Sequence, residues 1–259
     1  MSANPAPHWC VVTGAANGLG RDLTAGLLED GWHVAALDVD AAGLADLAAG
    51  LADRDRLATH EVDVRDRDAV RETVRRVGGH GELRALLNNA GIISVAPLVE
   101  MSRSDWDDVI DVNVNGAFYV GQAVGARLVE ESVPGRIINL GTISGKSPRP
   151  GRSSYCVSKA AVAMLTKMMA VELAPYGITV NTVSPGSAEG GVVWQNIERG
   201  HTTMEALVGG DLKRHRLGIP LGRLATSADV LGAVRYLLSD AAAHVTGDEL
   251  RVDGGQGMF

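Results

Sequence analysis

The stretch VVTGAANGLGRDL, from Val11 to Leu23, joins an apolar β-type run to a helical pattern through a glycine-rich turn. Gly14, Gly18 and Gly20 stand in that turn, where glycine lets the backbone approach a ligand closely. The free N–H groups and the dipole at the start of the following helix favour a negative charge. Turns use glycine for other reasons too, but a cluster between a first strand and a first helix is typical of pyrophosphate binding. We therefore predict a dinucleotide-binding turn here.

Working outward from this turn, short apolar runs alternate with longer amphipathic stretches along the chain. Such alternation predicts right-handed crossovers and a mostly parallel sheet with helices on both faces. No repeat, low-complexity tract or linker divides the sequence, so we expect one α/β domain over residues 1–259. The expected strands are residues 9–13, 33–38, 57–62, 83–89, 136–141, 178–184 and 249–253, and the expected helices are 19–30, 42–52, 66–77, 104–131, 155–174 and 227–239.

Residues 185–224 break this rhythm. A connection of that length between a strand and the last main helix is far beyond an ordinary loop. Its paired glycines, Gly190–Gly191 and Gly209–Gly210, suit a helical lid with flexible ends, whereas a plain surface excursion is the alternative. Long insertions at the C-terminal edge of such sheets usually line the ligand crevice. We expect a substrate lid over about residues 186–224.

The composition excludes several classes of function. The 259 residues are 46% hydrophobic and 21% charged, with a formal net charge of −7, so no basic stripe is available for a nucleic acid. No apolar segment approaches membrane-spanning length, and the N-terminus lacks the pattern of a signal peptide. Cys10 and Cys156 have no motif spacing, and the histidines are scattered, so we expect no metal site. Two unpaired thiols indicate a cytoplasmic protein.

Asp38 ends the second expected strand, well beyond Gly20. A carboxylate there can accept hydrogen bonds from both ribose hydroxyls of an adenosine and would repel a 2′-phosphate. No Arg or Lys follows Asp38 or lies inside the glycine turn to attract that phosphate. An ordinary strand-end acid is the alternative. The pattern favours NAD over NADP.

Tyr155 and Lys159, in SSYCVSKA (153–160), stand four residues apart and share one face of a helix. A free tyrosine has a pKa of about 10 and is a poor base at neutral pH. An ammonium about 5 Å away would stabilise the phenolate by roughly 3 kcal/mol at an effective dielectric of about 20, or about two pKa units. We therefore predict a lowered pKa for Tyr155, within range of general-base work. A purely structural pair is the alternative.

Five motifs follow one another in the order and spacing of a known family: TGAANGLG (13–20), NNAG (88–91), DVNVNG (111–116), YCVSK (155–159) and VSPG (183–186). From about Trp9 to Gly255 the chain resembles the short-chain dehydrogenase/reductase family. The resemblance implies a single Rossmann-type domain with a seven-stranded parallel sheet and helices on both faces. It also implies a nicotinamide cofactor, a small-molecule substrate and a homotetramer that pairs the two long helices.

The resemblance assigns catalysis to Asn113, Thr142, Tyr155 and Lys159. The family usually has serine where this chain has Thr142; threonine keeps the hydroxyl that binds substrate oxygen, and Ser144 is the alternative donor. Lys159 would also grip the nicotinamide ribose, and Asp63 would lie beside the adenine. The expected cofactor-binding residues are Gly14, Asn17, Gly18, Leu19, Gly20, Asp38, Asp63, Val64, Asn89, Ala90, Gly91, Tyr155, Lys159, Pro185 and Gly186.

Three further stretches, SPRPGRSSY (147–155), VSPGSAEG (183–190) and HRLGIPLGRLATSADV (215–230), point to a substrate class. They resemble 2,3-dihydro-2,3-dihydroxybenzoate dehydrogenases of catechol siderophore pathways. They equally resemble relatives that aromatise 2,3-dihydro-3-hydroxyanthranilate in antibiotic pathways. The resemblance implies NAD-dependent oxidation of a ring hydroxyl in an acidic cyclohexadiene, followed by aromatisation. A 3-oxoacyl or sugar-type ketoreductase and a non-catalytic dinucleotide-binding protein are the alternatives.

An acidic substrate needs a cation for its carboxylate. Arg149, just before Tyr155, is the first candidate for a bidentate clamp, and Arg214 and Arg216 in the lid come next. Trp194 could stack on the ring. The expected substrate-binding residues are Arg149, Ser144, Ser187 and Trp194.

Overall fold

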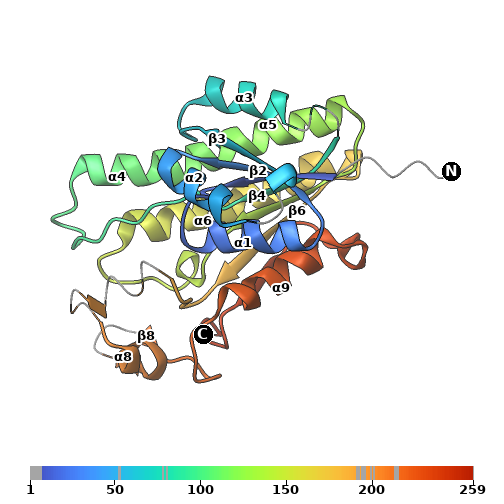
Figure 1. Ribbon diagram of the computed structural model, residues 1–259. Coiled ribbons are helices and arrows are strands. Elements are labelled where there is room, and N and C mark those ends of the chain that lie inside the picture. The colour runs from blue at the N-terminus through green and yellow to red at the C-terminus, as the bar shows by residue number, and fades with distance from the viewer. Residues whose placement is uncertain are drawn as a thin grey trace.

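A seven-stranded parallel sheet forms the centre of the molecule, with helices on both sides (Figure 1). The computed structural model describes residues 8–51, 54–77, 79, 81–190, 193, 197–198, 200, 202–212 and 216–258. The strand order is β3-β2-β1-β4-β5-β6-β9, and every neighbouring pair is parallel. The strands are β1 (His8–Thr13), β2 (His33–Asp38), β3 (Leu57–Glu61), β4 (Glu82–Asn88), β5 (Arg136–Leu140), β6 (Thr179–Pro185) and β9 (Glu249–Val252). The predicted fold class is confirmed.

Two apolar layers fix the sheet between the helices. Neighbouring residues of a strand point to opposite faces, so the adjacent Val11 and Val12, both fully buried, belong to different layers. Val12 packs in the layer of α1 (Gly18–Glu29), α2 (Ala41–Gly50) and α9 (Ser227–Leu238). Val11 packs in the layer of α3 (Arg67–Arg76), α5 (Ala117–Glu130) and α6 (Ser153–Leu173). Because both faces are covered, the central strands are buried on both sides and their apolar residues do not alternate with exposed ones.

The helix expected over residues 104–131 is divided into three parts. It consists of α4 (Arg103–Ile110), a π-helical turn η2 (Asp111–Gly116) and α5. Single π-turns inside α-helices are frequently found at functional sites. The side chain of Asn113 leaves this turn to bind the backbone of Ile92 in both directions, accepting from its N–H at 2.8 Å and donating to its carbonyl oxygen at 2.9 Å. The apolar spacing runs through the turn unchanged, which is why periodicity alone predicted one helix.

A chain of buried polar side chains crosses the sheet below the site. Thr13 donates to Asn88 at 3.3 Å, and Asn88 donates to Asn139 at 3.1 Å. Asn139 in turn donates to Thr166 at 2.9 Å, and Thr182 also donates to Thr166 at 3.0 Å. Buried polar groups are costly unless they are paired, so this chain links β1, β4, β5, β6 and α6 in one register.

The segment between β6 and α9 forms a small unit of its own. It contains α8 (Met204–Gly209) and an antiparallel pair of short strands, β7 (Gly210–Asp211) and β8 (Arg216–Leu217). Figure 1 shows α8 and β8 away from the central sheet, on the side where α9 lies. Leu207, Ile219 and Leu224 form its own apolar cluster. None of the helices in the described ranges is long and apolar enough to cross a membrane.

Candidate active site

A cleft of about 1020 Å³ opens at the carboxyl ends of β5 and β6, beside the turns that follow β1 and β4. The strand order reverses between β1 and β4, and open parallel sheets bind ligands at such a switch point. The predicted site residues that line the cleft are Gly18, Leu19, Asn89, Gly91, Thr142, Ser144, Arg149, Tyr155, Lys159, Pro185, Gly186 and Ser187. Those that do not line it are Gly14, Asn17, Gly20, Asp38, Asp63, Val64, Ala90 and Asn113.

The glycine turn has the shape that a pyrophosphate needs. A side chain at Gly20 would collide with the carbonyl oxygen of Gly14, whereas Gly18, at φ +52°, has open space beside it. Helix α1 begins at Gly18 without a side-chain cap, because Asn17 instead donates to Asp40 at 2.9 Å. The first backbone N–H groups of α1 are therefore left for an anionic group. The turn fits a dinucleotide.

The turn after β4 is tied directly to the glycine turn. The side chain of Asn89 donates to the carbonyl oxygens of Thr13 and Gly14 at 3.0 and 3.1 Å. The hydroxyl of Thr13 accepts the backbone N–H groups of Asn89 and Ala90, each at 3.0 Å. Thr13 was not among the predicted site residues, although it opens the motif that contains the glycines. It holds the two cofactor turns together as one unit.

Asp38 lies where β2 ends, against the glycine turn. Its carboxylate accepts the backbone N–H of Ala16 at 2.9 Å and that of Asp40 at 3.0 Å. Each bond uses a different carboxylate oxygen, so the group is fixed in orientation while lone pairs remain for a further donor.

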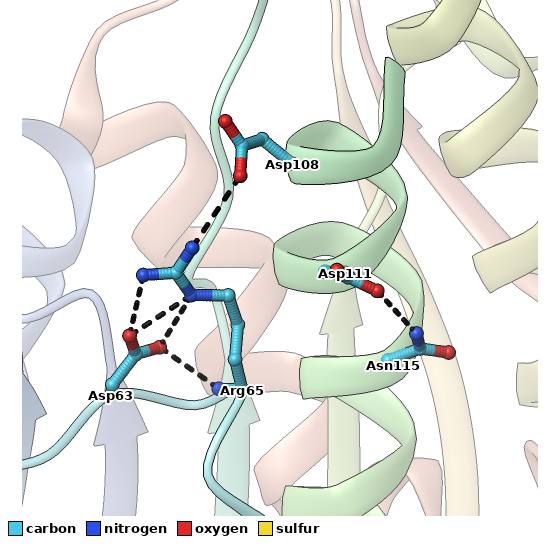
Figure 2. Close-up of polar contacts among 5 residues, drawn as sticks. All are labelled: Asp63, Arg65, Asp108, Asp111 and Asn115. Atoms are coloured by element: carbon cyan, nitrogen blue, oxygen red, sulfur yellow. Dashed lines mark hydrogen bonds and ion pairs between the residues drawn. The ribbon is translucent and has the colours of Figure 1, made fainter. Parts of the chain in front are cut away.

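Asp63 lies in an ion-pair network that the sequence did not predict (Figure 2). Arg65 donates to both carboxylate oxygens of Asp63, at 2.7 to 3.0 Å, and its Nη1 lies 3.5 Å from Asp108 of α4. The hydrogen bond from Arg65 holds the pKa of Asp63 below its usual value. Val64, the next residue, is buried and packs beside Gly116. Any contact of Asp63 with an adenine would have to share its carboxylate with Arg65.

Tyr155, Thr142 and Lys159 meet in the middle of the cleft. Tyr155 lies in the first turn of α6, and Thr142, two residues after β5, is close enough to its hydroxyl to lower its pKa. The hydroxyl of Thr142 also lies 3.4 Å from the carbonyl oxygen of Pro185. Lys159 is only 7% exposed; its Nζ donates to the carbonyl oxygen of Leu140 at 2.7 Å and lies 6.0 Å from the centre of the Tyr155 ring.

The predicted lowering of the Tyr155 pKa is wrong for the protein chain itself. Burial raises the pKa of Tyr155 above its usual value of 10.0, and this outweighs the opposite effects of Arg152 and of the Thr142 hydrogen bond. Burial also lowers the pKa of Lys159, to about 8. The prediction counted the attraction between phenolate and ammonium but left out the cost of removing both groups from water. A working base at Tyr155 therefore needs a further positive charge.

Asn113 is placed behind the cleft rather than in it. Its side chain is 1% exposed and donates to the hydroxyl of Ser158 at 3.0 Å, which donates to the carbonyl oxygen of Tyr155 at 2.8 Å. Gly91 lies beside the side chains of Asn113 and Lys159, and a side chain at this position would meet both of them. The arrangement makes Asn113 a group that positions the loop at Ile92 and the start of α6.

Three arginines line the same cleft as Tyr155 and Lys159. Arg149 and Arg152 precede Tyr155, and Arg216 comes from β8 in the predicted lid. Burial, together with the neighbouring guanidinium groups, lowers the pKa of Arg149 and lowers that of Arg216 to about 10. Sequence reasoning named Arg149 and Arg216 but missed Arg152, which is visible only as a second arginine in the same loop. Trp194 and Arg214 lie outside the described residues.

A parallel sheet with a glycine turn after its first strand, and a cleft lined by a half-buried tyrosine and a buried lysine, defines a nicotinamide dinucleotide-binding oxidoreductase. The comparisons with known proteins name the family. A family model described as "Enoyl-(Acyl carrier protein) reductase" matches residues 14–256, and the chain belongs to the short-chain dehydrogenase/reductase family. It is an enzyme of the short-chain dehydrogenase type.

Relatives with different activities are about equally similar. The 2,3-dihydro-2,3-dihydroxybenzoate dehydrogenase of Bacillus subtilis is 34% identical over 246 residues, which cover 94% of each chain. The 3-oxoacyl-[acyl-carrier-protein] reductase FabG of Thermotoga maritima is 36% identical and covers 95% of this chain and 96% of its own.

Two solved structures carry different cofactors. The structure of ElxO with NADP bound has a TM-score of 0.86 and 26% identity, and covers 98% of this chain and all of its own. An NAD⁺-bound xylitol dehydrogenase has a TM-score of 0.84 and 31% identity, and covers 96% of this chain and 98% of its own.

Proposed function

We propose that this protein oxidises a ring hydroxyl of a dihydro-hydroxy aromatic acid with NAD⁺, and that the product aromatises. The candidate substrates are 2,3-dihydro-2,3-dihydroxybenzoate and 2,3-dihydro-3-hydroxyanthranilate, in siderophore or antibiotic biosynthesis. The observation that carries the proposal is that Arg149, within a group of arginines, lines the same cleft as Tyr155 and Lys159. A buried cation needs a counter-charge, and a small organic acid supplies one. The likeness to the Bacillus subtilis dehydrogenase supports the same substrate class.

In this proposal Tyr155 accepts the proton of the ring hydroxyl as the C–H hydride leaves that carbon and a carbonyl forms. Thr142, which lines the cleft with Tyr155, orients the substrate oxygen, with Ser144 beside it. Bound NAD⁺ would supply the hydride acceptor and a positive charge beside the phenol. Lys159, held by Leu140, would bind the nicotinamide ribose. The ring carbonyl then tautomerises to a phenol, which makes the oxidation effectively irreversible.

We propose NAD rather than NADP because of the residue that would face the adenosine ribose. Asp38 presents a carboxylate fixed by two backbone N–H groups, where a 2′-phosphate would be repelled. The solved structures of similar chains include both cofactors, so the proposed preference for NAD rests on Asp38.

We also propose a homotetramer. Helices α5 and α6 expose apolar side chains that a second copy of the chain would cover: Phe118 at 39%, Met164 at 59%, Met168 at 49% and Val171 at 73% exposure. These side chains lie on the two long helices that the family resemblance predicts to pair.

A 3-oxoacyl reductase is the second candidate, because FabG of Thermotoga maritima is as similar as the dihydroxybenzoate enzyme. One experiment separates the two. The purified protein is given NAD⁺ or NADP⁺ with each dihydro acid, and NADH or NADPH with an acetoacetyl thioester, while reduced cofactor and aromatic product fluorescence are followed. We expect NADH and a fluorescent product from a dihydro acid. Reduction of the thioester, with neither acid oxidised, would contradict the proposal.

A further inference from the structure

Arg216 is held at the substrate end of the cleft by hydrogen bonds that use only one of its nitrogens. Its Nη2 donates to the hydroxyl of Ser187 at 2.7 Å and to the carbonyl oxygen of Leu207 at 3.2 Å. Its Nη1 and Nε make no hydrogen bond to the described part of the chain. Asp211 is its cross-strand neighbour on β7 and raises its pKa, but burial outweighs this effect. Arg216 is therefore fixed in place with donors to spare.

Gln256, near the end of the chain, sets the position of Ser187. It is 3% exposed, lines the cleft, and its Oε1 lies 3.0 Å from both the backbone nitrogen and the hydroxyl of Ser187. A backbone N–H can only donate, so the oxygen of the amide must face Ser187. The single hydroxyl proton of Ser187 then goes to Gln256, and its lone pair accepts the N–H of Arg216. The amide nitrogen of Gln256 has no partner among the described residues.

The positive charge of the arginines around Arg216 favours binding of an anion. Arg149 and Arg152 lie close enough to lower its pKa, so three guanidinium groups share one partly dry space. Asp211 and Glu189 also line the cleft, but the three guanidinium groups outnumber them, so the site favours a further negative charge over a neutral hydroxyl or thioester. A carboxylate offers two oxygens in one plane, which match the fork of a guanidinium.

Resting on the proposed function, we propose that Arg216 binds the substrate carboxylate. We further propose that Gln256 is a positioning residue that acts on Arg216 through Ser187. The chain Gln256–Ser187–Arg216 joins the C-terminal segment, the loop after β6 and the hairpin of the predicted lid. It makes the protein selective for acids over uncharged analogues of the same shape.

The test measures binding of two matched pairs of probes to the full chain with NADH, by calorimetry. The pairs are 2,3-dihydroxybenzoate with catechol, and benzoate with benzamide, so that each acid has a neutral counterpart. The wild type should bind each acid more tightly than its counterpart. Arg216→Gln should weaken acid binding about 10- to 100-fold, the loss expected for a charge-assisted pair, and leave the neutral probes within about two-fold. Arg223→Gln is the matched control, because Arg223 pairs with Asp229 on the surface.

Two variants each remove one member of the hydrogen-bond series that leads from Gln256 through Ser187 to Arg216. Gln256→Met and Ser187→Ala should each weaken acid binding about 3- to 10-fold while NADH affinity and the circular dichroism spectrum stay unchanged. The double variant Arg216→Gln/Gln256→Met should bind acids no more weakly than Arg216→Gln alone, because Gln256 acts through Arg216. A purely structural role of Gln256 would instead add to the loss.

The proposal is overturned if the wild type binds acids no better than neutral probes, or if Arg216→Gln leaves acid binding unchanged. Additive losses in the double variant would overturn the positioning role of Gln256. If the proposed oxidation is wrong but the role of Arg216 is right, the result is a different one. The dihydro acids would then not be oxidised, while the preference for acids and its dependence on Arg216 would persist.

Discussion

At the scale of single residues, Lys159 is a buried cation that costs stability. It is 7% exposed, and burial lowers its pKa from 10.5 to about 8. A shift of that size corresponds to about 3 kcal/mol of penalty for holding the charged amine at neutral pH, partly offset by its hydrogen bond to Leu140. Functional sites commonly retain such costs, because the same burial strengthens electrostatic effects on a bound ligand.

We predict that Lys159→Met abolishes turnover yet is as stable as the wild type at about pH 7, or up to about 2 kcal/mol more stable. The penalty is fully present below the folded pKa of about 8. It disappears as the pH rises from there to the unfolded value of 10.5, because in that window the unfolded chain holds more protons. Urea denaturation at about pH 7 and pH 10 measures this.

The control is Lys167→Met, which removes an exposed lysine of the same helix and leaves Lys159 in place. A Lys159→Met protein that is clearly less stable at pH 7, or a difference that does not shrink toward pH 10, would contradict the account.

Sequence reasoning found the residues whose signal is local. Tyr155 and Lys159 are four residues apart, and Gly18 lies within a short motif. It missed Thr13 and Gln256, because each acts on a segment far away in the chain: Thr13 on the turn after β4, and Gln256 on Ser187. The direction of the Tyr155 pKa also depends on burial, which a spacing of residues does not reveal.

At the scale of elements, Asn113 joins the π-helical turn η2 to the loop at Ile92 and to α6. Asn113 makes three hydrogen bonds, two with the backbone of Ile92 and one with Ser158. No periodicity predicts this turn, because the bonds of Asn113 go to Ile92, in a loop that is distant in sequence. The strands of the central sheet and the helices α1, α2, α3, α6 and α9 were predicted to within a residue or two, since caps and apolar runs mark their ends.

We predict that Asn113→Ala lowers the free energy of unfolding by about 2–4 kcal/mol, because the N–H and carbonyl of Ile92 lose their partner. Activity should fall as well, since the loop at Ile92 and the backbone of Tyr155 lose their support. Asn115→Ala is the matched control. Asn115 lies in the same turn and bonds to Asp111 within it (Figure 2), so its loss should cost less than about 1 kcal/mol. Equal effects of the two variants in urea denaturation would argue against this view.

At the scale of the whole molecule, strand order decides where the chemistry takes place. The reversal between β1 and β4 leaves a crevice, and the turns after these strands, together with the ends of β5 and β6, deliver the glycine turn, Asn89, Thr142 and Pro185 to it. Parallel order followed from the alternation of strands and helices. The packing of the described part of residues 186–224 could not be predicted, because its short elements α8, β7 and β8 carry no periodic signal and because Leu221, after β8, bonds to the distant Gly254.

The central claim is that Tyr155 moves the proton in an oxidation that NAD⁺ completes. The most direct measurement compares the initial rate of NADH formation by the wild type and by Tyr155→Phe, with a dihydro acid as substrate. Removal of a general base predicts a loss of at least about 100-fold, with NAD⁺ affinity nearly unchanged. A Tyr155→Phe enzyme that forms NADH as fast as the wild type would contradict it.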